Sequence, residues 1–107
     1  MNEARIDLLK TYIKEEPNDP FNYYGLACEY MHEEPDEALK LFETLLADHK
    51  DYLPTYYQAA QLLVSFEKNE AAVAVYEKGI ALAKVQNNAK AIKELSAALQ
   101  NLLFEME

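Results

Sequence analysis

Hydrophobic residues in this chain recur three and four positions apart, the spacing that places them on one face of an α-helix. Ile6, Leu9 and Ile13 mark the first such stretch, over residues 3–15. Further stretches follow at 20–32, 35–48, 54–66, from 69 past Ile80, and at 88–105. Strand-like alternation never persists, and no Asn-Gly or Asp-Gly hairpin turn occurs. The pattern predicts an all-α protein of about six helices.

Capping residues and prolines predict where these helices begin. Asp19 can cap the second helix, and Pro20 fits its first position, where the missing N–H of proline costs nothing. The same reasoning places further starts at Pro35, at Pro54, at Asn69 as a cap, and after Asn87-Asn88. Connections this short predict that consecutive helices are antiparallel neighbours.

Two segments of the chain repeat one another. In both, a first helix carries large and small residues, and in a second helix a small residue is followed by an aromatic one. The matching positions lie 33 or 34 residues apart. The first segment has Tyr23, Leu26, Ala27, Tyr30, Ala38, Phe42 and Leu45. The second has Tyr56, Ala59, Ala60, Leu63, Ala72, Tyr76 and Gly79. A period near ~34 with these residue types is typical of a stacked helix-hairpin array.

This pattern resembles the tetratricopeptide repeat (TPR) family, in which small residues allow close helix contact and aromatic residues fill the gaps between hairpins. The first helix resembles the end of a preceding unit. The last helix, with Ile92, Leu95, Leu99, Leu102 and Met106 on one face, resembles the cap that closes such arrays. The resemblance implies one antiparallel helix-hairpin domain over residues 1–107. It would contain half a repeat, two repeats at about 20–52 and 53–86, and a C-terminal capping helix at about 88–105.

The composition narrows the classes of partner. The net charge is −9, from 19 acids and 10 bases, so nucleic acid and anionic membrane surfaces would repel the chain. A neutral or basic protein partner is favoured. Cys28 is the only cysteine, which excludes an intrachain disulfide. With neither a signal segment nor an apolar run long enough to span a membrane, the acidic chain is expected to be cytoplasmic.

Resemblance to the TPR family also implies a concave groove lined by the first helix of each hairpin. The corresponding positions are Phe21, Tyr24, Gly25, Cys28 and Met31 in one helix, and Pro54, Tyr57, Gln58, Gln61, Val64 and Ser65 in the other. We expect partner binding at Phe21, Tyr24, Cys28, Met31, Tyr57, Gln58 and Gln61. Tyrosine suits such a surface because it offers a large contact area and a hydroxyl. Alternatively, these rings pack against the last helix or a second copy of the chain, or are simply exposed.

No feature of the sequence points to catalysis. Nucleophile-elbow, phosphate-loop and zinc-protease motifs are absent. His32 and His49 have acidic neighbours but sit at helix ends, where solvated side chains are the usual case, so no metal or other cofactor is expected. Cys28 lies mid-helix beside Glu29 and is expected to be a packed residue. The sequence therefore predicts a non-catalytic scaffold module that binds a peptide or helix in an aromatic groove. The alternative is a structural homodimer formed through that groove.

Overall fold

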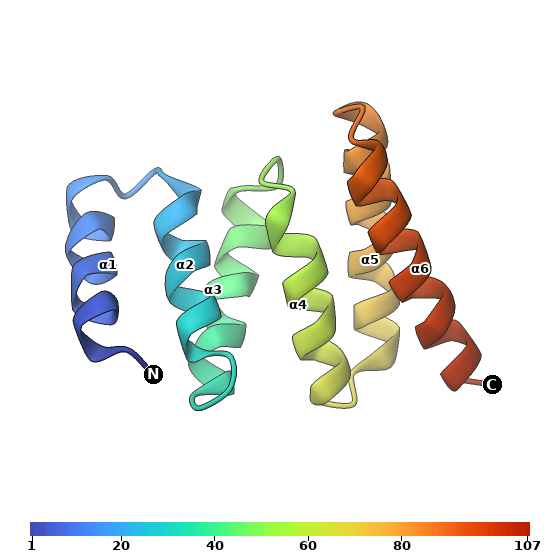
Figure 1. Cartoon of the computed structure of the whole chain (residues 1–107), viewed down its shortest axis with the longest axis horizontal. Helices are drawn as coiled ribbons and strands as arrows, with labels where there is room; N and C mark the ends of the chain where they lie inside the picture. Colours follow the sequence, from blue (N-terminus) through green and yellow to red (C-terminus); the bar gives the residue numbers. More distant parts are fainter. The chain divides into compact units, whose positions relative to one another are not determined.

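The computed structural model describes all 107 residues and consists of six α-helices without strands, which confirms the all-α prediction (Figure 1). The helices are α1 (Glu3–Glu15), α2 (Pro20–Tyr30), α3 (Pro35–Asp48), α4 (Pro54–Ser65), α5 (Asn69–Val85) and α6 (Ala89–Glu105). They form two compact units, unit 1 (Met1–Thr55) and unit 2 (Tyr56–Glu107). The boundary between the units falls within the first turn of α4.

Most of the predicted helix starts are confirmed. A side-chain oxygen of Asp19 accepts a hydrogen bond from the Phe21 N–H at 3.0 Å, and Asn88 caps α6 in the same way through the Ala91 N–H at 3.0 Å. Each bond satisfies a backbone donor that the first helical turn leaves without a partner. Three helices, α2, α3 and α4, begin at a proline as expected.

The prediction for Asn69 is wrong, because this residue is the first residue of α5 and not its cap. Its Oδ1 atom is buried and has no hydrogen-bond partner. The reason lies at the end of α4, where Glu67 adopts a left-handed φ of 59° and the Lys68 N–H donates to the Leu63 carbonyl at 2.9 Å. That is a Schellman-type ending. It leads the chain straight from Lys68 into α5, so the Asn69 side chain is already inside the helix.

Unit 1 is a helix hairpin with α1 packed on one side. Ile6 and Leu9 of α1 lie in one buried cluster with Leu26 of α2. Gly25 makes this approach possible, since a Cβ atom there would lie only 3.2 Å from a Leu9 methyl carbon. The hairpin of α2 and α3 buries Phe42 completely. These contacts are apolar, so burial of hydrophobic surface stabilises the unit.

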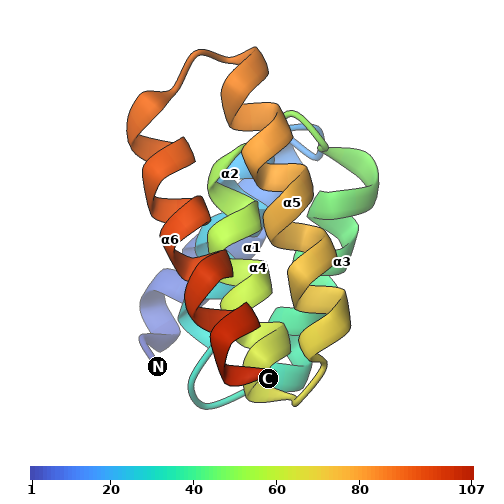
Figure 2. The same ribbon diagram turned by 90° about the vertical axis from the view of Figure 1, so that its right-hand side faces the viewer.

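Unit 2 is built around close contact between α4 and α5. A Cβ atom on Gly79 would lie 2.7 Å from the Tyr56 Cβ and 3.2 Å from a methyl carbon of Leu95. Three helices therefore meet at Gly79, and only a residue without a side chain fits there. Ala60 and Ala72 are fully buried, as the repeat pattern predicts. The last helix, α6, lies along α5 (Figure 2).

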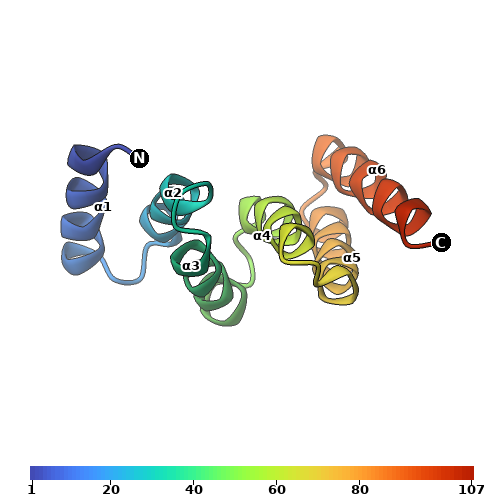
Figure 3. The same ribbon diagram turned by 90° about the horizontal axis from the view of Figure 1, so that it is seen from below.

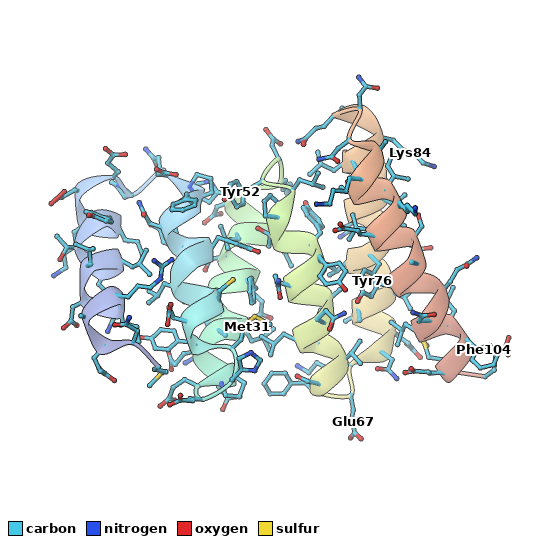
Figure 4. The ribbon with its side chains drawn as sticks, viewed as in Figure 1. Met31, Tyr52, Glu67, Tyr76, Lys84 and Phe104 are labelled. Atoms are coloured by element: carbon cyan, nitrogen blue, oxygen red, sulfur yellow. The ribbon has the colours of Figure 1, made fainter.

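The C-terminal end of α6 is the most exposed apolar part of unit 2. Leu95 and Leu102 are buried, but Met106 lies beyond the end of the helix and is 40% exposed. Leu103 is 45% exposed, and Phe104, at 77%, points away from the other helices of the unit (Figure 4). The buried stripe of α6 therefore ends about one turn before the chain does.

We predict that Gly79→Ala destabilises the protein. The new methyl group would overlap Tyr56, and overpacking of this kind typically costs about 1–3 kcal/mol. At the 2.7 Å separation found here the cost falls in the upper part of that range and outweighs the gain in helix propensity of about 1 kcal/mol from replacing glycine by alanine. Gly25→Ala is the matched control, because its new methyl group would meet the movable end of the Leu9 side chain. Urea unfolding of both variants measures the difference, and equal stability of the two would contradict the account.

Candidate protein-binding groove

Unit 2 contains a groove of about 520 Å³ between α4 and α6, with α5 as its floor. Seen end-on, α4 and α6 lie on the two sides of α5 (Figure 3). The lining residues are Tyr57, Gln61 and Val64 of α4, Tyr76 of α5, and Glu94, Ala97, Ala98, Asn101, Leu102 and Glu105 of α6. Ligand sites in proteins are commonly concave and combine apolar surface with polar groups, and this groove joins aromatic and aliphatic residues with two amides and two carboxylates.

Two tyrosine rings form the aromatic part of the groove. The ring centroids of Tyr57 and Tyr76 lie 6.3 Å apart at an interplanar angle of 72°, an edge-to-face contact that is favourable for aromatic pairs. Tyr76 projects from α5 between α4 and α6 (Figure 4), and its hydroxyl accepts a long hydrogen bond of 3.5 Å from the Gln61 amide. Burial raises the pKa of Tyr76, and the hydrogen bond with Gln61 partly opposes that shift. The Tyr76 hydroxyl is therefore neutral at physiological pH.

The α6 wall combines small and acidic residues. Ala97 is exposed and Ala98 is half-buried, so the centre of this wall carries only short side chains. Glu94 and Glu105 are the only charged residues that line the groove. A nitrogen of Lys90 lies 3.8 Å from Glu94, but both side chains of this pair are more than half exposed. Exposed pairs of this kind contribute little, so the Glu94 carboxylate remains accessible to a stronger partner.

The acidity of the chain is unevenly distributed between the two units. Unit 1 contains 13 acids and 5 bases, which gives a net charge of −8, whereas unit 2 contains 6 acids and 5 bases, which gives −1. The overall charge of the chain therefore says little about the groove. Its electrostatic character depends on the two glutamates that line it.

Three of the predicted groove positions line this groove, namely Tyr57, Gln61 and Val64, and the first two are among the expected binding residues. Gln58 is half-buried and does not line it. The hydroxyl of Ser65, another predicted groove position, donates a hydrogen bond to the Leu62 carbonyl of its own helix at 2.6 Å. Sequence reasoning missed the α6 wall. One available signal was the recurrence of an acid after three helical turns, at Glu94 and Glu105.

The remaining predicted site residues lie in unit 1. Phe21 is 57% exposed in the first turn of α2. Tyr24 is half-buried, with its ring centroid 5.7 Å from that of Tyr52 and edge-on to it. Met31 is half-buried at the C-terminal end of α2. The prediction that Gly25 lines the groove is wrong, because this residue is buried beneath Leu9. On this surface the Tyr24 ring is thus engaged by a neighbouring ring, whereas the Phe21 ring is mostly exposed.

Cys28 is half-buried beside Tyr24, with which it forms a hydrogen bond. Burial raises the pKa of the Cys28 thiol above its ordinary value, and the hydrogen bond to Tyr24 partly opposes the shift. A thiol with a raised pKa is protonated at neutral pH and reacts poorly.

The structure contains no group of three histidine, cysteine, aspartate or glutamate side chains placed to hold a metal ion. His49 lies instead against Tyr23, with ring centroids 5.9 Å apart. No helix has the length and apolar character that a membrane span would need.

Two solved structures are similar to this chain over most of its length. One is the solution NMR structure of a tetratricopeptide repeat domain protein from Salinibacter ruber, which is 34% identical, covers 81% of this chain and 89% of its own, and has a TM-score of 0.77. The other is a crystal structure of a tetratricopeptide repeat domain protein from the same organism. It is 34% identical, the match covers 78% of this chain and 94% of that one, and the TM-score is 0.75. No family model matches the chain, and a search of curated proteins found no match.

This protein belongs to the tetratricopeptide repeat family. The resemblance inferred from the repeated aromatic and small residues is thereby confirmed. The family's helical arrays serve as protein-interaction modules that present extended binding surfaces. They are typically non-catalytic, and the absence of an enzymatic activity in this chain stays a prediction.

We predict that the Cys28 thiol of the folded protein reacts several-fold more slowly with Ellman's reagent at pH 8 than it does in the denatured chain. Its pKa is raised by folding, so at any pH below that value less thiolate is present in the folded state. The rate of colour development with and without guanidinium chloride measures this. A faster reaction in the native protein would contradict the burial of this thiol.

Proposed function

We propose that this chain is a protein-interaction module that binds a segment of another protein in the unit 2 groove. The observation that supports it best is the make-up of the groove. Ala97 and Asn101 line it yet are exposed, so the packing of the helices does not require them. Tyr57 and Leu102 offer apolar contact beside them. A surface with this combination suits a partner segment.

Residue chemistry also favours the groove over the α2 surface. Tyrosine is among the residues that contribute most to protein interfaces, because its ring is large and its hydroxyl can form hydrogen bonds. Tyr57 is half-buried and faces the groove, and the amides of Gln61 and Asn101 can bond to polar groups of a partner. On α2, by contrast, Tyr24 already contacts Phe42 and Tyr52, so less of its ring is available.

Self-association through the same groove is the alternative function. The groove would then hold part of a second copy instead of another protein. Unit 2 carries little net charge to oppose such pairing. Sedimentation equilibrium separates the two. A monomer at all concentrations supports the interaction module, and a dimer that dissociates on the groove-filling substitution Ala97→Trp would establish self-association.

We predict that filling the groove abolishes partner binding. Ala97→Trp puts a large ring into the groove from an exposed position, so the fold should tolerate it. Peptides selected from a displayed random library against the wild-type protein should bind this variant at least about tenfold more weakly, the loss expected when a central contact is blocked.

Gln100→Trp is the matched control, because Gln100 is an exposed residue of α6 that does not line the groove. It should retain full binding, and circular dichroism should show both variants folded. Equal binding of the selected peptides to wild-type protein and both variants would contradict a site in this groove.

A further inference from the structure

We infer that the occupant of the groove is an amphipathic helix with two basic residues three turns apart. This inference rests on the proposed function and adds the chemistry of the partner. It is drawn from the spacing of two carboxylates on α6, from the small residues between them, and from the scarcity of partners for an extended backbone.

The two carboxylates set the spacing that the basic residues of a partner helix must have. Glu94 and Glu105 are separated by eleven residues, which is about three helical turns and about 16 Å along α6. Because three turns bring a helix back to nearly the same direction, both side chains point to the groove side of α6, and both line it. A partner helix lying along α6 meets both of them if it carries lysine or arginine residues at the same spacing. The match holds for either direction of the partner helix.

Between the two carboxylates, the α6 side chains that line the groove are mostly short. Ala97, Ala98 and Asn101 occupy this stretch of α6, and the Tyr57 and Tyr76 rings lie across the groove from it. Small residues let a neighbouring helix approach closely, while the rings and Leu102 provide apolar surface for its side chains. The partner therefore needs apolar residues at helical spacing between its two bases.

A helix fits this groove better than an extended peptide does. An extended chain brings unpaired backbone N–H and C=O groups that need partners when buried. The residues that line the groove all belong to helices, whose own backbone groups are bonded within each helix, so an extended chain finds no strand edge to pair with. A helix satisfies its own backbone groups and presents only side chains, which is how amphipathic helices bind in hydrophobic grooves.

The charges that line the groove favour a basic partner. No cationic side chain lines the groove. The nearby Lys90 is 86% exposed and only 3.8 Å from Glu94 at its nearest approach, so a better-placed base can displace it. Both glutamates lie at a partly exposed rim, where their main effect is on specificity and on the rate of association.

A pair of designed peptides tests the inference. The first is a fluorescein-labelled helical peptide with two lysines eleven residues apart and leucines between them on the same face. The second has glutamate in place of both lysines. Fluorescence anisotropy with the wild-type protein should show tighter binding of the lysine peptide, by about two- to fivefold for each charge and less at high salt. Charge-reversed protein (Glu94→Lys with Glu105→Lys) should prefer the glutamate peptide.

The matched control is Glu43→Lys with Glu77→Lys, which changes the net charge equally at exposed positions outside the groove. It should keep the wild-type preference. An unchanged preference in the charge-reversed protein would overturn the inference, as would equally tight binding of a lysine peptide whose helix is broken by a central proline.

The outcome also separates this inference from the proposed function. If both peptides bind equally well and Ala97→Trp abolishes both, the groove is a binding site but the inference about charge is wrong. If neither peptide binds, and the library peptides also ignore Ala97→Trp, both proposals fail.

Discussion

The close approach of three helices at Gly79 is the constraint on which unit 2 depends. Tyr56 of α4 and Leu95 of α6 both reach the space that a side chain at this position would occupy. With α4 and α5 in such contact, Tyr76 is buried at the bottom of the space between α4 and α6. The groove is thus a consequence of the packing. Its floor is the buried Tyr76, and Leu102 of its α6 wall is a core residue as well. Other wall residues are exposed, namely Gln61, Ala97 and Asn101.

Because several wall residues lie outside the core, they can vary without disturbing the fold. Ala60 and Ala72 are fully buried, and a larger residue at either position would separate the helices. Ala97, Asn101 and Glu105 are exposed and can change without loss of packing. The buried small residues therefore specify the fold, and under the proposed function the wall residues would specify the partner. In this chain the wall is acidic at two points and small between them.

Much of the fold could be predicted from the sequence because local physical signals define it. Helical periodicity, first-turn prolines and the Asp19 cap indicate the helix boundaries, and the small and aromatic residues at a period of ~34 indicate the family. Asn69 was misjudged because the left-handed turn at Glu67 shortens the connection, and glutamate gives no warning of that conformation. The organisation of residues 1–107 as one domain stays a prediction.

The candidate site was only half predictable, since it depends on how α6 packs. Tyr57 and Gln61 follow from the repeat pattern, whereas Glu94, Ala98 and Glu105 line the groove only because of the direction in which α6 lies along α5. The most direct test of the account is backbone amide NMR mapping with the lysine peptide. If the peptide binds in the unit 2 groove, the largest shift changes fall at residues 57–64 and 94–105, with little change at residues 21–31. The reverse pattern would contradict the account.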